Sequence, residues 1–455
     1  MPSAADVLAG FVIGLAFLAL VGAAELWRRF GDPPAEWTRK LVHVGGGIVC
    51  TLFPFVIDSH WVVLVLALLM LVLFVAGKKL GLLKGVHGVE RKSHGTEYYP
   101  LVIYLLFVLA HREPWLYVIC VMVLAFSDAA AALIGKRFGR IRYEVEDEHK
   151  SLEGSLACLL TTFCIVAGLL LIWPDPAIPA AGVCLLAALL AAALVTAFEA
   201  VSLDGGDNLW VPLGTYLVLS RSLTRPSDEI ALEIVCLAVM VLSIGICAWR
   251  TRAFNVGGTL TFILYAFASW SIGSFDWALP VFLGLIVYAI AIWLAGRPGI
   301  YRVRPVLRAM LPPFLLLLAA NVVWRDTSWR AAAFGPFLAG CVTVVAQSVW
   351  NLLHWQRSEG FLARPPAAIW IALACLAVMV APLGWRQRTV AWEAWLVVSA
   401  VSIAVTLAYG RLAPSVFGNP TSDRSAAGRA LLTCTAMLAV FALQAAGRLP
   451  AWQLR

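Results

Sequence analysis

Charged residues are scarce in this chain. Of its 455 residues only 13% are charged and 62% are hydrophobic, whereas soluble domains contain about 25% charged and about 45–50% apolar residues. The composition therefore excludes a soluble globular domain as the main part of the chain. The net charge of +8 does not indicate a nucleic-acid partner in so apolar a chain; what matters is where the positive charges lie.

Cys-x-x-Cys pairs, and basic residues ahead of the first apolar run, are also missing. The ten cysteines lie mostly inside apolar runs and none forms a Cys-x-x-Cys pair, so they indicate small buried hydrophobic residues rather than disulfides or zinc ligands. No Lys or Arg occurs in Met1–Asp6, ahead of the first apolar run. We therefore interpret that run as the first membrane span and not as a removed signal peptide.

Long hydrophobic runs recur through the whole sequence. A membrane-spanning helix needs about 20 apolar residues, within a range of about 17–25. Counting runs near that length predicts about sixteen transmembrane segments, and hence an all-α, polytopic integral membrane bundle. Clear examples are Val7–Ala24, Trp61–Ala76, Leu152–Trp173, Ile178–Phe198, Ile234–Trp249, Val281–Ala295 and Trp392–Tyr409.

Positive charge is distributed unevenly over the first half. If the spans alternate, the loops after spans one, three and five contain fourteen Lys and Arg residues, and the opposite face up to residue 220 contains Arg112 alone. The positive-inside rule makes the basic face cytoplasmic and the N-terminus external. We expect a protein of a bacterial inner membrane, or its equivalent, with the loops of the site in the cytoplasm.

A polar stretch, Arg221–Glu229, is the best boundary between two domains. We expect a catalytic domain over residues 1–228 and a second polytopic domain of unknown role over 229–455. Just before the boundary, Leu209–Ser220 contains Pro212 and Gly214 and is short for a span, so the sequence leaves open whether it crosses or is re-entrant.

The segment SDAAAALIGKRFG (Ser127–Gly139) contains an acid at the end of an apolar run. Acids within membrane helices are costly and are functional by default, which makes Asp128 a candidate. Lys136 and Arg137 lie eight and nine residues further on, about two turns or more along a helix, so they are poor partners and a bound Mg²⁺ is the better candidate. Gly135 and Gly139 are four residues apart. That spacing is typical of a close-packed helix pair. It also suits a phosphate-binding segment, in which the lack of side chains lets the phosphate approach the backbone.

The segment KSLEGS (Lys150–Ser155) opens the next apolar run. Ser151 can cap the helix, and a helix N-terminus beside Lys150 is a favourable anion site. Glu153 adds a carboxylate that could hold a divalent cation against a phosphate. The alternative is an ordinary capped helix with a lysine at the membrane interface.

Three acids and no basic residue occur in EAVSLDGGDN. Hard oxygen ligands at Glu199, Asp204, Asp207 and Asn208 indicate Mg²⁺. A solvated turn around Gly205–Gly206 is the alternative.

Basic groups recur in ERKSHGTEYYP and RKLVH. Basic residues beside a glycine suit phosphate oxygens, although the positive-inside rule and a structural histidine explain the same residues. The candidates in these segments are Glu90, Arg91, Thr96, Arg39, Lys40 and His43.

Together, RKLVHVGGG, ERKSHGTEYYP, SDAAAALIGKRFG, KSLEGS and a later E…DN…P resemble the CTP-dependent lipid kinases, which include dolichol kinase, phytol kinase and the yeast-type diacylglycerol kinase. The resemblance covers roughly residues 36–215. It implies transfer of the γ-phosphate of CTP to a lipid alcohol (a polyprenol, phytol or diacylglycerol) with Mg²⁺ or another divalent cation. The expected partners are this alcohol, the nucleotide and membrane lipids, with no nucleic acid; the oligomeric state is open.

Transferred by motif, the resemblance implies three groups of site residues. The catalytic residues are Asp128, Lys150 and Glu153. The metal ligands are Asp128, Glu153, Glu199 and Asp207. The residues that bind nucleotide or phosphate are Arg39, Lys40, His43, Glu90, Arg91, Thr96, Ser127, Gly135, Ser151, Gly154, Ser155 and Asn208.

Two other functions fit parts of the sequence. Phosphatidate cytidylyltransferases share a similar Asp…Gly…Lys-Ser/Thr-x-Glu-Gly pattern but react at the α-phosphorus of CTP. The number of apolar runs also fits a lipid transporter or flippase, although transporters place their binding residues near the bilayer midplane, whereas the polar groups here lie at helix ends and in loops.

Overall fold

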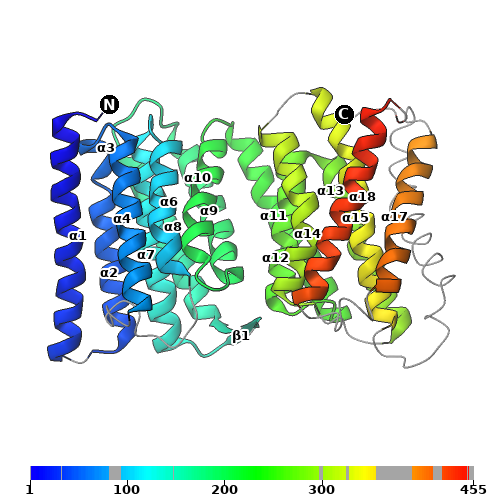
Figure 1. The fold of residues 1–455 in the computed structure, drawn as a ribbon, viewed down its shortest axis with the longest axis horizontal. Helices are drawn as coiled ribbons and strands as arrows, with labels where there is room; N and C mark the ends of the chain where they lie inside the picture. The colour runs from blue at the N-terminus through cyan, green and yellow to red at the C-terminus, as the bar shows by residue number, and fades with distance from the viewer. Residues whose placement is uncertain are drawn as a thin grey trace. The chain divides into compact units, whose positions relative to one another are not determined.

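The chain is almost entirely helical in a computed structural model. The structure describes residues 2–31, 33–80, 94–146, 148–296, 301–323, 327–354, 392–412, 423–447 and 449. Within these ranges it contains α-helices, two short π-helical segments and one two-stranded sheet (Figure 1). The candidates Glu90 and Arg91 lie outside the described residues.

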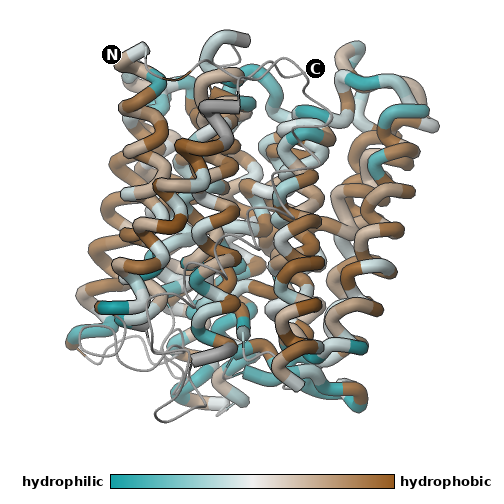
Figure 2. The backbone as a smooth tube through the Cα atoms, turned by 90° about the vertical axis from the view of Figure 1, so that its right-hand side faces the viewer, coloured by the Kyte–Doolittle hydropathy of each residue, from teal (hydrophilic) through white to brown (hydrophobic). Residues whose placement is uncertain are grey.

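Twelve described helices are long and apolar enough to cross a membrane. Two shorter apolar helices accompany them, Gly95–Leu109 and Leu396–Leu412. Figure 2 shows hydrophobic residues along the helices of this view and hydrophilic residues mainly near their ends. This confirms the all-α polytopic membrane fold, but not the count of sixteen. The uncertain segment Leu209–Ser220 lies in a single helix that is not one of the twelve.

The chain divides into two compact units, Met1–Val235 and Cys236–Arg455. The division falls within a helix, α11 (Ser227–Thr251), a few residues beyond the boundary expected from the sequence. The described elements of the first unit are α1 (Ala4–Gly31), α2 (Ala35–Cys50), α3 (Phe53–Val56), α4 (His60–Lys79), α6 (Gly95–Leu109), α7 (Pro114–Phe138), β1 (Arg142–Val145), β2 (Glu148–Ser151), α8 (Leu152–Ile172), α9 (Ala181–Val201) and α10 (Asp207–Ser222).

The second unit continues from α11 with helices alone in its described part. Its elements are α12 (Val256–Ala268), η1 (Ser269–Gly273), α13 (Phe275–Ala295), α14 (Val303–Leu318), η2 (Ala319–Val323), α15 (Thr327–His354), α17 (Trp392–Leu412) and α18 (Asp423–Ala445).

One helix in each unit lies at its centre. The apolar windows of α7 and α15 are 61% and 89% buried, more than those of the other candidate spans. A helix that is apolar on all sides can lie among other helices or in lipid, and the burial of α7 and α15 shows that other helices surround them. In the first unit α7 packs against α2, α8 and α10, so an acid near its end, Asp128, is held among several helices.

A small β-hairpin lies between α7 and α8, which the sequence analysis did not predict. β1 and β2 are antiparallel, with Tyr143 opposite Lys150 and Arg142 opposite Ser151. Glu146, in the turn, has a φ of 56°, the left-handed conformation of tight turns. The hairpin holds Lys150 in a strand and ends where α8 begins, which fixes the direction in which the lysine leaves the backbone.

Candidate functional site

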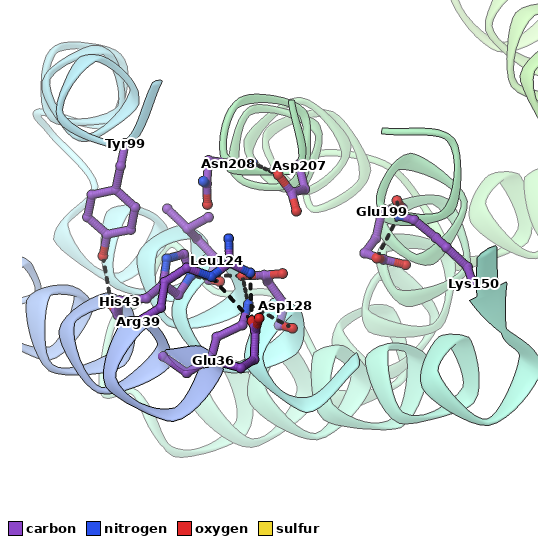
Figure 3. A network of polar contacts seen from close by, with 11 residues as sticks. Glu36, Arg39, His43, Tyr99, Leu124, Asp128, Lys150, Glu199, Asp207 and Asn208 are labelled. Carbon is purple, nitrogen blue, oxygen red and sulfur yellow. Dashed lines mark hydrogen bonds and ion pairs between the residues drawn. The ribbon is translucent and has the colours of Figure 1, made fainter. Parts of the chain in front are cut away.

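A buried acid–base cluster joins α2 to α7 (Figure 3). The Lys40 ammonium lies 2.5 Å from Oδ2 of Asp128, and the side chains are 5% and 10% exposed. Nε2 of His43 lies 3.2 Å from the same oxygen. Lys40 and His43 are three residues apart on α2, so one face of that helix presents both to α7.

The histidine has a defined orientation in this cluster. Its Nε2 is also 3.0 Å from the carbonyl oxygen of Leu124. Both neighbours of this nitrogen accept hydrogen bonds, so Nε2 carries the hydrogen. The Tyr99 hydroxyl donates to the carbonyl of His43 at 3.2 Å and the two rings meet edge to face, which fixes the ring from the side of α6.

Lys40 keeps part of its donor capacity in this arrangement. An ammonium has three N–H groups. Its described acceptors are Oδ2 and the backbone carbonyl of Asp128, the latter at 3.4 Å. One N–H is thus available for a further acceptor, such as a phosphate oxygen, among the residues that the structure describes.

A second ion pair joins the hairpin to α9. Lys150 donates to the carboxylate of Glu199 at 2.8 Å and also to the Glu199 carbonyl oxygen. Burial opposes the charged form of Lys150, but the carboxylates of Glu199 and Asp207 outweigh it and raise the pKa above its usual value. The lysine therefore stays cationic at neutral and moderately alkaline pH.

Asp207 and Asn208 begin α10, and in Figure 3 their side chains point toward the cluster around Asp128. Asp207 acts electrostatically on Arg39, His43 and Lys150. Its Oδ1 accepts from the backbone N–H of Asn208 at 3.0 Å. The Oδ1 of Asn208 is buried and has no hydrogen-bond partner in the part of the chain that the structure describes, and a buried oxygen of this kind needs a donor or a cation.

Each predicted metal ligand has contacts within the protein. In the described part of the chain no three His, Cys, Asp or Glu side chains converge in the manner of a preformed metal site. Asp128 and Glu199 face lysines, and Glu153 accepts from the backbone N–H groups of Arg140 and Ile141 at 2.9 and 3.2 Å. Mg²⁺, however, is commonly held by one or two protein oxygens together with substrate phosphates, and the oxygens of Asp207 and Asn208 fit that arrangement.

These contacts correct one argument from the sequence. We expected Asp128 to need a bound cation because Lys136 and Arg137 were too distant along the helix to pair with it. The structure supplies the cation from α2, as Lys40. The buried charge of Asp128 is therefore no evidence for a metal ion at that residue.

The glycines of the two motifs lie at a close helix contact. A Cβ added to Gly154 would lie 2.8 Å from the carbonyl oxygen of Ala131 and 3.1 Å from the Cα of Gly135. Ser151 caps α8 by accepting from the N–H of Gly154 at 3.1 Å, as predicted. Helix packing accounts for the small residues here, and the cap already satisfies one N–H of the expected anion site.

The remaining candidates lie around this contact or at the first turn of α6. Ser127 is fully buried and accepts from the Thr162 hydroxyl at 2.8 Å, so it holds α7 against α8. Ser155 contacts the Tyr143 hydroxyl at 2.6 Å. Thr96 lies in the first turn of α6. Just before this turn, the backbone N–H of His94 donates to the Asp204 carbonyl oxygen, which ties the start of α6 to the loop between α9 and α10.

Sequence reasoning missed three members of the cluster. Tyr99 and the Leu124 carbonyl orient His43. Glu36 binds Arg39 at 2.7 Å and directs its guanidinium. The spacing of Glu36 and Arg39, three residues apart on a helix, was a usable signal, but a backbone carbonyl leaves none in a sequence.

The first unit is thus a membrane helix bundle with two buried lysine–carboxylate pairs. The start of α10, with the acid Asp207, lies at the same end of the bundle. The chain is similar over 202 residues to the phytol kinase of Synechocystis sp., at 34% identity, covering 44% of this chain and 85% of the relative. The chain belongs to the phytol kinase family of lipid kinases. No family model and no solved structure matches.

Proposed function

We propose that the first unit transfers the γ-phosphate of CTP to an isoprenoid or other lipid alcohol, with phytol, a polyprenol or diacylglycerol as the substrate class. The observation that carries the proposal is the buried Lys40–Asp128–His43 cluster beside Asp207 and Asn208, in a chain related to a phytol kinase. Phosphoryl transfer depends mainly on positioning and charge neutralisation, and this end of the unit offers both.

The cationic groups have a clear role in this proposal. Lys40 and Lys150 each use two donors on protein acceptors and keep a third for a phosphate oxygen. Arg39, half exposed and fixed by Glu36, adds a guanidinium suited to phosphate. Asp128 holds Lys40 and His43 in place, and Glu199 does the same for Lys150.

The oxygen ligands complete the nucleotide site. Asp207 and Asn208 would hold Mg²⁺ together with the triphosphate, and the ion would reduce the charge repulsion of the phosphates when bound. Glu153 is the weakest of the proposed metal ligands, because its carboxylate is occupied by backbone N–H groups.

Two labels of CTP test the reaction. Purified protein is incubated with phytol, a polyprenol or diacylglycerol and with CTP labelled at either the γ- or the α-phosphorus. The proposal expects γ-label in the lipid. Incorporation of α-label would identify a cytidylyltransferase instead, and movement of lipid across vesicles without any labelled product would identify a transporter.

We further propose that the site faces the cytoplasm, on the basis of the fourteen basic residues on that face. Single cysteines at positions 92, 148 and 206, in a background without the native cysteines, should all react with an impermeant reagent from the cytoplasmic side. Reaction of any one of them from the outside contradicts a common cytoplasmic site.

The domain boundary is tested by truncation. We propose that residues 1–228 contain the whole catalytic site, since every described site residue lies there. A fragment 1–228 that is monodisperse in detergent should keep measurable kinase activity. A well-folded but inactive fragment would show that residues 229–455 complete the site.

A further inference from the structure

The second unit encloses an aromatic and apolar cavity among α12, α13, α14 and α15. Its volume is about 50 Å³ and it opens at its mouth; a single water molecule needs about 10–15 Å³ on the same measure. Along α14 its lining extends from Pro305 to Pro313, about 12 Å at 1.5 Å per residue. Apart from one arginine, its lining contains no charged side chain.

That arginine, Arg429 on α18, is 1% exposed. Its Nη1 donates to the Tyr301 hydroxyl at 3.1 Å and the guanidinium lies 5.0 Å from the centre of the Tyr301 ring. Its Nε and Nη2 have no hydrogen-bond partner, and no carboxylate pairs with it in the described residues. Buried charges are normally paired, so the guanidinium lacks an anion.

A second unpartnered group lies at the same end of the cavity. Tyr288 lines it, and its hydroxyl is buried with no hydrogen-bond partner among the residues that the structure describes. The Tyr288 ring lies 5.7 Å from that of Tyr301, so Tyr288 and Arg429 both lie next to the Tyr301 ring. Tyr301 in turn accepts from Asn351, and Asn351 from Tyr409. A network of hydrogen bonds thus fixes the aromatic platform on which Arg429 lies.

We propose that this cavity binds an anionic amphiphile, a single apolar chain ending in a phosphate or a carboxylate. The chain would lie between α13, α14 and α15, against Leu285, Met310 and Val344. The anionic head would accept from Nε and Nη2 of Arg429 in the bidentate geometry that guanidinium favours, and from the Tyr288 hydroxyl. The proposal does not depend on phosphoryl transfer by the first unit.

The test uses the full-length protein in a neutral detergent. Dodecyl phosphate, dodecanoate, dodecanol and inorganic phosphate are compared by calorimetry, and a dodecyl phosphate with a diazirine at its chain end is cross-linked by light and mapped. We expect one or both anionic amphiphiles to bind, with cross-links on α13, α14 or α15. Dodecanol and inorganic phosphate should bind at least tenfold more weakly, because each lacks half of the recognised chemistry. A preference for dodecyl phosphate identifies a lipid phosphate, the product class of a lipid kinase; a preference for dodecanoate identifies a fatty acid.

Variants localise the binding. Arg429→Gln should weaken binding about 30-fold or more and abolish the cross-links on these helices, and Tyr288→Phe should weaken it about three- to tenfold. Arg330→Gln is the matched control, since Arg330 is also an arginine of this unit but is bonded to Asn321 and Gly273, away from the cavity.

A filled cavity gives a second measure that leaves the arginine in place. Ala309→Phe adds a ring to the lining and should abolish binding while the protein stays monodisperse. Equal binding of dodecanol, unchanged cross-linking in Arg429→Gln and Ala309→Phe, or no binding of any probe would each overturn the proposal. Cross-links confined to residues 1–235 would also do so, since they would report a product site in the first unit.

Discussion

The two units treat a buried cation in opposite ways. In the first unit Lys40 and Lys150 each contact a carboxylate, Asp128 or Glu199. In the second unit Arg429 is more buried than either lysine, yet two of its nitrogens have no partner among the described residues. Because an unpaired buried charge is strongly unfavourable, the first arrangement is complete without a ligand and the second is not.

This difference separates two kinds of binding site. A lysine that is paired with a carboxylate and has one remaining N–H can bind a phosphate that later leaves with a product. The carboxylate still neutralises the lysine after the product has left. An unpaired arginine in an apolar cavity is stabilised by an anion that stays. The first arrangement suits turnover and the second suits retention of a ligand, and four changes in the first unit test whether its pairs work in this way.

The largest effect is expected from Asp128→Asn. Loss of the carboxylate charge removes the anion that neutralises Lys40 and orients His43, and we expect kinase activity to fall about a thousandfold or more, equivalent to about 4 kcal/mol. The amide still accepts a hydrogen bond from Lys40, so the protein should remain inserted and folded. Asp6→Asn, a change at another buried acid of this unit, is the control. Activity of Asp128→Asn within about tenfold of wild type would make the pair structural only.

Removing Lys40 from the Lys40–Asp128 pair should lower the stability of the protein. Lys40→Met leaves Asp128 buried and uncompensated, which we expect to lower the free energy of unfolding by about 3–5 kcal/mol. The double variant Lys40→Met, Asp128→Leu should recover most of this stability but none of the activity. Thermal unfolding in detergent measures the first quantity, with the half-exposed Lys78 changed to Met as the control. A double variant as unstable as the single one would show that the pair does not explain the loss.

Asp207→Asn tests the oxygen ligands at the start of α10. We expect the Mg²⁺ concentration for half-maximal activity to rise about tenfold or more, with a smaller change in kcat at saturating Mg²⁺. Titration of activity with Mg²⁺ after treatment with a chelator measures this shift. Asp175→Asn, in the loop before α9, should leave the titration unchanged. An unaltered Mg²⁺ dependence in Asp207→Asn would remove Asp207 from the metal site.

The smallest effect is expected from Tyr99→Phe. The change removes one hydrogen bond to the His43 carbonyl, worth about 0.5–1.5 kcal/mol, while the edge-to-face ring contact remains. Activity should fall by about tenfold at most. A loss as large as that of Asp128→Asn would show that the tyrosine hydroxyl takes part in the reaction itself.

Much of the first unit followed from local patterns. Apolar runs of span length predicted membrane helices, and the motif segments selected Asp128, Lys150 and the Ser151 cap. The count of spans was less secure, since a helix such as α10 is apolar in part but too short and too polar to qualify. The β-hairpin was missed because four-residue strands leave only a weak periodic signal.

The sequence did not predict which charged residues pair when they lie in distant segments of the chain. Asp128 was correctly selected as an acid that needs a partner, but the partner was sought along its own helix and assigned to a metal ion. Lys40 lies 88 residues away in the chain, and nothing in local spacing connects the two. The same holds for Arg429 and Tyr301, 128 residues apart, and no motif in the second half marked either residue.

The sequence by itself determined that this protein lies in a membrane, because the length of an apolar run is a local property of the chain. Charge bias and short motifs are also local, so they determined in which segments of the first half the polar residues gather and which lipid kinases the chain resembles. Only the tertiary structure decided which charges neutralise one another, that the motif glycines serve helix packing, and that an arginine of the second unit is left without an anion. The physical reason is that the energy of a buried charge depends on what lies within a few ångströms of it, and helices far apart in the chain supply those neighbours.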